Sequence, residues 1–132
     1  MSISRMTHKT DIQLRFFDSD AFGHLSNIAF SLYAEQARVD FFFNVIKQNN
    51  NLILAHIDLD FKIQANLTDT VYVETGVIKI GNTSIKIKQD IYANDKVATT
   101  AKSVIVLFDY EQQKPMPIPD EARALLNKYL VD

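Results

Sequence analysis

One long helical pattern, between residues 28 and 46, constrains the fold more than any other feature of the chain. Apolar residues recur there at three- and four-residue spacing, which is the period of one helix face. At 1.5 Å per residue such a helix is about 30 Å long, comparable to the diameter of a small domain, so the rest of the chain must bury it. We expect one buried face of Ile28, Leu32, Val39, Phe42 and Ile46, widened by Phe30, Ala34, Ala37 and Phe41.

The rest of the chain mostly shows the two-residue alternation that is typical of β-strands. A first strand is predicted over 12–16, before the helix, and the asparagines at 49–51 end the helix. Four further runs, at 55–64, 71–80, 85–91 and 97–108, are joined by short links that favour antiparallel hairpins. Prolines at 115, 117 and 119 end the sheet, and Asp120 is expected to cap a final helix through Leu130. Such a sheet can bury the long helix only by wrapping around it.

Length and composition limit the possible classes of protein. The 132 residues fit one domain, 1–132, without an internal repeat or a linker. No apolar run approaches the roughly 20 residues that span a bilayer, and the N-terminal residues do not resemble a signal peptide, so we expect a cytoplasmic protein without a membrane partner. The absence of cysteine excludes disulfides, thiolate catalysis and cysteine-ligated zinc. A net charge of −2 without a long basic run gives no reason to expect nucleic acid as a partner.

The segment before the helix concentrates the side chains that can carry chemistry. It reads Arg15-Phe-Phe-Asp-Ser-Asp-Ala-Phe-Gly-His-Leu-Ser-Asn27. Gly23 permits a turn with positive φ, and Ser26 or Asn27 can cap the helix. A carboxylate therefore lies close to a helix N-terminus, whose free N–H groups can hold a developing oxyanion. The same residues also fit an aspartate-rich turn with an ordinary cap, so spacing alone leaves both interpretations open.

This segment resembles the signature of the 4-hydroxybenzoyl-CoA thioesterase-like family of acyl-CoA thioesterases, R-x-x-D-x-D-x-x-G-H-x-N-N, then an aromatic residue and E-x-x-R on the helix. Weaker similarity to F-x-x-P-x-x-x-x-D-x-V at 61–71, I-G-x-S-S at 80–84 and V-A-x-A at 97–101 extends it over about residues 10–118. The resemblance implies an α+β hotdog fold, an antiparallel β-sheet wrapped around a long central α-helix. Ser26 in place of the first N and the missing proline in Gln64-Ala65-Asn66 are departures from the signature.

The resemblance implies an enzyme, an acyl-CoA thioester hydrolase that converts a fatty-acyl or aromatic acyl-CoA to the free acid and coenzyme A. Asp20 matches the catalytic aspartate, as general base or as nucleophile, and the backbone N–H of Asn27 would hold the oxyanion. Gly23 would let the loop bring the helix end near Asp20. His24 would orient substrate or water, with an exposed loop imidazole as the alternative. The resemblance implies no metal. It also implies no cofactor, because coenzyme A is part of the substrate.

The implied partner besides acyl-CoA is a second copy of the chain. Hotdog domains of this group form homodimers or homotetramers through their sheets, with each active site built across two subunits. A non-catalytic acyl-CoA-binding or regulatory module is the alternative function, and retention of Asp20 favours the enzyme over it. A dehydratase-type hotdog ranks third, because its aspartate and histidine are spaced differently.

Other polar residues are assigned lesser roles. Asp18 is expected to be a turn carboxylate, and Tyr33 a core or subunit-contact residue. Glu35 and Arg38 have the spacing of an ion pair, with Glu35 as a reserve catalytic candidate. His56, Asp58 and Asp60 are interpreted as a polar strand face rather than a metal site. Candidates for contact with the coenzyme A phosphates are Lys62, Lys86, Lys88 and Lys102.

Overall fold

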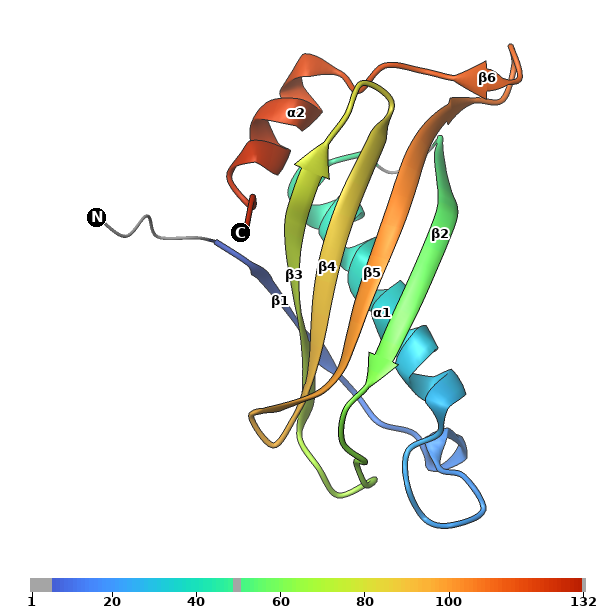
Figure 1. The fold of residues 1–132 in the computed structure, drawn as a ribbon, viewed down its shortest axis with the longest axis vertical. Helices are drawn as coiled ribbons and strands as arrows, with labels where there is room; N and C mark the ends of the chain where they lie inside the picture. Colours follow the sequence, from blue (N-terminus) through green and yellow to red (C-terminus); the bar gives the residue numbers. More distant parts are fainter. Residues whose placement is uncertain (1–5, 49–50, 132) are drawn as a thin grey trace.

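A curled antiparallel sheet wraps around one long helix in the computed structural model, which describes residues 6–48 and 51–131 (Figure 1). The predicted hotdog arrangement is confirmed. The features predicted for residues 1–5, 49 and 50 lie outside the described residues. The elements are β1 (His8–Ile12), η1 (Phe16–Asp18), α1 (Asn27–Asp40), η2 (Phe41–Ile46), β2 (Leu52–Phe61), β3 (Val71–Ile80), β4 (Ser84–Ala93), β5 (Lys96–Asp109), β6 (Lys114–Pro115) and α2 (Asp120–Asn127).

The strand order of the sheet is β1-β3-β4-β5-β2, with the short β6 paired to β5, so β1 and β2 form its two edges. These two edge strands differ in length and polarity. The β1 edge is five residues long and carries charge, since Lys9 lies 3.7 Å from Asp11 and 4.4 Å from the centre of the Tyr72 ring. The β2 edge is ten residues long, and Leu54 and Phe61 are exposed along it. One edge is therefore short and polar, and the other is long and partly apolar.

The central helix runs on from α1 into a π-helical segment, η2, and crosses the concave side of the sheet diagonally (Figure 1). Its sheet-facing side is made of small residues at the crossing, where Ala34 and Ala37 are fully buried. Gln89 of β4 donates a 3.0 Å hydrogen bond to the carbonyl of Ala34, which ties the helix to the sheet. Farther along, Phe41 packs with Leu126 of α2 in a second cluster of buried residues. No helix in the described ranges is long and apolar enough to cross a membrane.

The predicted buried face of the helix is partly wrong. Ile28, Leu32 and Val39 are 73%, 43% and 47% exposed. The other residues predicted for this face are buried as predicted: Phe42 and Ile46, and also Phe30, Ala34, Ala37 and Phe41. Apolar side chains surround this helix on nearly all sides, so their period does not identify the face that the sheet covers. The sheet packs on the face that carries the small alanines, because only small side chains let a helix and a sheet approach closely. An apolar stripe on the opposite face is consequently left in solvent.

Element boundaries were predicted well for the later strands and less well elsewhere, since the strand predicted over 55–64 is β2 at Leu52–Phe61, three residues earlier. The strand predicted over 71–80 coincides with β3, and the later hairpins are present. The first strand was placed too late: β1 ends at Ile12, because its register pairs Ile12 with Val71, and Phe16 lies in the 3-10 turn η1. The prediction for the last helix is partly wrong: Asp120 is its first residue rather than its cap, the N-cap position is Pro119 without a side-chain hydrogen bond, and the helix ends at Asn127 rather than at Leu130.

Candidate active site

A buried carboxylate, Asp18, anchors the loop that precedes α1. Its Oδ2 accepts hydrogen bonds from the Tyr33 hydroxyl at 2.7 Å and from the backbone N–H of Arg15 at 3.0 Å, and Oδ1 accepts one from the Arg15 guanidinium at 3.0 Å. Burial raises the pKa of Asp18, but the hydrogen bonds from Tyr33 and Arg15 outweigh it and hold the pKa below its ordinary value. Asp18 is therefore an ionised turn carboxylate, as predicted, and Tyr33 is a core residue.

The second carboxylate, Asp20, lies at the surface in a tight turn. Its Oδ1 accepts hydrogen bonds from the backbone N–H groups of Phe22 at 2.8 Å and His24 at 3.1 Å. Gly23 closes this turn with a φ of +84°, the positive value predicted for it. Within the part of the chain that the structure describes, Oδ2 has no hydrogen-bond partner, so one oxygen of Asp20 is held in place and the other is available for chemistry.

The helix N-terminus beside this turn keeps a free donor. Ser26 is the N-cap, and its hydroxyl accepts a 3.1 Å hydrogen bond from the N–H of Ile28. The backbone N–H of Ser26 donates to the Asp18 carbonyl at 2.7 Å, and that of Leu25 to the Ala65 carbonyl at 2.7 Å. Asn27 is the first helical residue, and its N–H has no acceptor among the described residues. Such an N–H points away from the helix at its positive end and can bind an anion.

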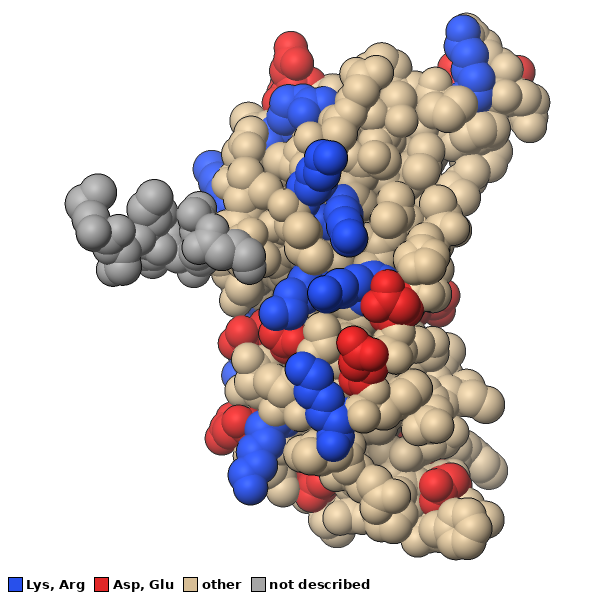
Figure 2. All heavy atoms as spheres, in the orientation of Figure 1, with Lys and Arg blue, Asp and Glu red and all other residues tan. Residues whose placement is uncertain are grey.

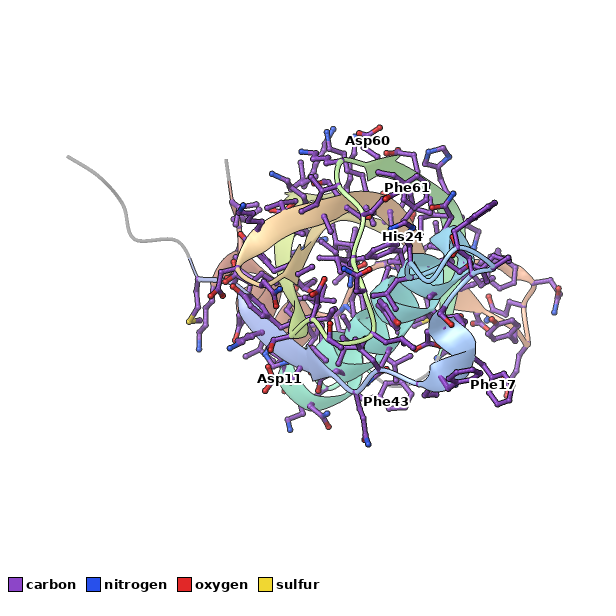
Figure 3. The ribbon with its side chains drawn as sticks, turned by 90° about the horizontal axis from the view of Figure 1, so that it is seen from below. Asp11, Phe17, His24, Phe43, Asp60 and Phe61 are labelled. Carbon is purple, nitrogen blue, oxygen red and sulfur yellow. The ribbon has the colours of Figure 1, made fainter. Side chains whose placement is uncertain are left out.

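These groups meet in one cleft of about 320 Å³. Asp20, His24 and Asn27 line it together, and Gly23 lies in the same loop without lining it. His24 and Phe61 lie next to each other at this end of the sheet in Figure 3, where Asp60 lies farther out. The remaining lining residues are Leu25, Phe30, Lys62, Ile63 and Gln64.

The lysine candidates separate clearly in space. Lys62 lines the cleft with Asp20. Lys86 and Lys88 alternate along β4 with the buried Ile85, Ile87 and Gln89, and so face the outer side of the sheet, where basic side chains gather in Figure 2. Lys102 is directly opposite Lys88 in the register of β4 and β5. Of the four lysines, Lys62 is therefore the one beside the candidate active site.

Two other clusters do not join this site. The helix residues Glu35 and Arg38 form no ion pair with each other, so that prediction is wrong. His56 and Asp58 are exposed on β2, with Nε2 of His56 lying 3.3 Å from Oδ2 of Asp58. No group of three or more histidine and carboxylate side chains arranged to hold a metal occurs within residues 6–48 and 51–131.

Apart from Lys62, sequence reasoning did not identify the part of the site that follows β2. The bridge between His24 and Asn66, together with the Leu25–Ala65 hydrogen bond, brings the segment after β2 against the loop that precedes α1. Phe61 and Gln64 thereby enter the cleft. The one sequence feature that pointed to this segment was its weak similarity, over 61–71, to the family pattern. That similarity does not show which residues the segment contacts.

Comparison with known proteins decides the family. The model of the thioesterase-like superfamily matches residues 14–126. The chain belongs to this superfamily. Recognition of the family from the loop motif is thereby confirmed, whereas the match does not assign a role to any residue. No match was found among curated proteins.

Several solved structures, two of them of proteins described as thioesterases, share the fold. A predicted thioesterase from Bacillus stearothermophilus is 27% identical with a TM-score of 0.89, over 96% of this chain and 98% of that one. A Thermus thermophilus thioesterase complexed with coenzyme A and zinc is 24% identical with a TM-score of 0.83, over 93% and 98%. A Staphylococcus aureus protein in complex with CoA is 10% identical with a TM-score of 0.85, over 100% and 90%. The hotdog fold therefore extends across sequences that have diverged widely.

Proposed function

We propose that this protein is an acyl-CoA thioesterase, with Asp20 as its catalytic carboxylate. The main support is that one cleft contains three features together. These are the Asp20 carboxylate, whose Oδ2 accepts no hydrogen bond among the described residues, the N–H of Asn27 at the helix N-terminus, which likewise has no acceptor there, and apolar walls. Thioester hydrolysis needs these parts: an activated nucleophile, a donor for the oxyanion and a surface for the acyl group. Membership of the thioesterase-like superfamily supports this choice of reaction.

In the general-base route, Oδ2 of Asp20 takes a proton from water while the water oxygen bonds to the thioester carbon. The carbonyl oxygen becomes an oxyanion, which accepts a hydrogen bond from the N–H of Asn27. Collapse of this intermediate breaks the C–S bond, and the leaving thiolate of coenzyme A takes up the proton. In the nucleophilic route, Oδ2 of Asp20 itself bonds to the thioester carbon, and the C–S bond breaks to release the thiolate of coenzyme A. Water then hydrolyses the resulting anhydride to the free acid and the Asp20 carboxylate, and the proton that this step releases balances the one taken up by the thiolate. His24 orients the substrate or the water in both routes.

Coenzyme A itself is the proposed second part of the substrate. Two proteins of the same fold are solved with coenzyme A, which supports this choice. Lys62 is the proposed contact for a phosphate group, because it is the lysine that lines the cleft. The acyl group would pack on Phe30 and Phe61, which suits a fatty or an aromatic chain. We propose no metal or other cofactor for this chemistry.

We also propose that the protein works in the cytoplasm as a homodimer or homotetramer. The long open edge of β2 supports self-association, because an unpaired strand edge readily accepts another strand. Large apolar side chains are also exposed on the loop before α1 and on the first turn of that helix. They include Phe16 (77% exposed), Phe17 (92%), Phe22 (85%) and Ile28 (73%).

The experiment is an assay of free thiol release from a panel of acyl-CoA substrates, with wild type and Asp20→Asn. We expect the variant to lose at least about 10²-fold in kcat, since it cannot act as base or nucleophile. Asp60→Asn is the matched control, because Asp60 is exposed and outside the cleft. Wild-type turnover by Asp20→Asn would refute the assignment. Binding of acyl-CoA by a wild-type protein that hydrolyses none of the panel would instead identify the non-catalytic module.

A further inference from the structure

Gln64 occupies the position at which the signature F-x-x-P-x-x-x-x-D-x-V has its proline. It also lines the cleft of Asp20, together with His24 and Asn27. A proline has neither a hydrogen-bonding side chain nor a backbone N–H, whereas a glutamine side chain ends in a carboxamide with two N–H donors and one C=O acceptor. This chain therefore places a polar group in its cleft that the signature does not supply.

The backbone on both sides of Gln64 is held in place. On one side, the N–H of Ile63 donates a 3.2 Å hydrogen bond to the carbonyl of Ala98. On the other side, the carbonyl of Ala65 accepts a 2.7 Å hydrogen bond from the N–H of Leu25, in the loop before α1. Binding through residue 64 consequently orders only one side chain, which keeps the entropic cost of the contact small.

The carboxamide of Gln64 is available to a ligand. The side chain is exposed, and it makes no hydrogen bond with any residue within 6–48 and 51–131. Lys62 in the same cleft can only donate hydrogen bonds, and the Asp20 carboxylate can only accept them. A carboxamide does both side by side, so it is complementary to another amide.

The pantetheine arm is the part of coenzyme A that carries amides. The phosphates and the thioester carbonyl accept hydrogen bonds, and a hydrocarbon acyl group neither donates nor accepts them. The nearer of the two pantetheine amides is separated from the sulfur by two carbons. Adenine also donates and accepts, but it lies beyond the diphosphate, and a cleft of about 320 Å³ that holds the thioester cannot hold the adenine as well.

The order of polar groups along the segment after β2 matches the order of groups along coenzyme A. Lys62, the proposed phosphate contact, comes first, and Gln64 follows it. Asn66 then forms a bridge with His24, in the turn that contains Asp20. Gln64 therefore lies between the phosphate contact and the proposed catalytic carboxylate, just as the nearer amide lies between the phosphates and the reacting carbon.

We propose that the carboxamide of Gln64 pairs with the pantetheine amide nearest to the sulfur and thereby selects thioesters of amide-bearing thiols such as coenzyme A. Its N–H donates to the amide C=O, and its C=O accepts the amide N–H. The reaction does not change this amide, so the contact is equally strong in the ground state and in the transition state and lowers KM without changing kcat. The inference rests on the acyl-CoA substrate proposed above and is independent of the role of Asp20.

The test compares thioesters of one acyl group with three thiols: coenzyme A, N-acetylcysteamine and pentanethiol. N-acetylcysteamine copies the sulfur end of pantetheine with its amide, and pentanethiol has the same chain length without the amide. Gln64→Met keeps the length of the side chain and removes its hydrogen-bonding groups. We expect it to lower kcat/KM about tenfold for the two amide-bearing thioesters, through KM, and by less than about twofold for the pentanethiol thioester.

Gln112→Met, in the exposed turn after β5, is the matched control and should change none of the three values. The ratio of two kcat/KM values does not depend on the folded fraction of a preparation, so partial unfolding of a variant cannot produce the expected selectivity. Equal losses for amide-bearing and amide-free thioesters, a loss confined to kcat, or no loss at all would each overturn the proposal.

Titration calorimetry with S-methyl-pantetheine measures the same contact without turnover. Binding about tenfold weaker by Gln64→Met than by wild type supports the proposal, and equal binding by the two, or no binding by wild type, overturns it. Thioester hydrolysis by wild type is measured separately. A wild type that hydrolyses the thioesters without the expected selectivity would therefore remove this inference and leave the proposed reaction standing.

Discussion

Tyr33→Phe tests most directly which interaction holds the loop before α1 in place. The substitution removes only the hydroxyl that donates a 2.7 Å hydrogen bond to the buried carboxylate of Asp18. Hydrogen bonds to charged groups contribute about 1.5–3 kcal/mol, so the free energy of unfolding should fall by that amount. For a domain of this size, a loss of about 2 kcal/mol lowers Tm by about 6–10 °C. The ring stays in place, so no cavity contributes to the loss.

The effect should depend on pH in a defined direction. The folded-state pKa of Asp18 is lowered, so its interactions stabilise the fold above its ordinary pKa and are lost as the pH falls through the folded-state pKa. Removing the hydroxyl raises the pKa of Asp18 toward its ordinary value. The stability difference between wild type and variant should therefore be complete at pH 7 and shrink in acid below about pH 4.

Urea unfolding at pH 7, and at lower pH where the fold persists, measures both the loss of stability and its dependence on pH. Tyr110→Phe is the matched control, because Tyr110 is half exposed and its hydroxyl makes no hydrogen bond with the described residues. It should change stability by less than about 0.5 kcal/mol. Equal stability of the two variants at pH 7, or a difference that does not diminish in acid, would show that this hydrogen bond does not hold the loop as argued.

Three further predictions concern the cleft. Asn27→Pro should lower kcat by about 10²–10³-fold by deleting the oxyanion donor, whereas Asn27→Ala keeps that N–H and should be mild. Proline is favoured at the first helical position, and Ser26 before it already has the extended ψ of 148° that a following proline requires. The melting curve of Asn27→Pro should therefore match that of wild type. A folded and fully active Asn27→Pro variant would contradict the mechanism. Lys62→Ala should raise KM for acyl-CoA about two- to fivefold with little change in kcat, and Lys102→Ala should change neither; equal KM values for the two variants would exclude the phosphate contact. Activity should survive EDTA, and inactivation that zinc reverses would contradict the metal-free route.

The local turn chemistry of the site was predictable from sequence because it depends on neighbours along the chain. Gly23 has the positive φ and Ser26 caps the helix as predicted. The exposed stripe that includes Leu32 was not predictable, because the choice of buried face depends on contacts with strands far along the chain. The same limit applies to Phe61 and to the unpaired Arg38, whose surroundings are set by tertiary packing.

The unequal edges of the sheet limit how the protein can assemble. When an edge strand pairs with a copy of itself about a two-fold axis, its outward backbone N–H and C=O groups are all hydrogen-bonded, and it cannot accept a further strand. The opposite edge, β1, is only five residues long and carries the charges of Lys9 and Asp11, which discourages further strand addition. Growth by strand addition would therefore stop at two copies. A sheet with two long apolar edges could instead propagate into a fibre, so the short charged strand protects the protein from aggregation while the long one remains available for assembly.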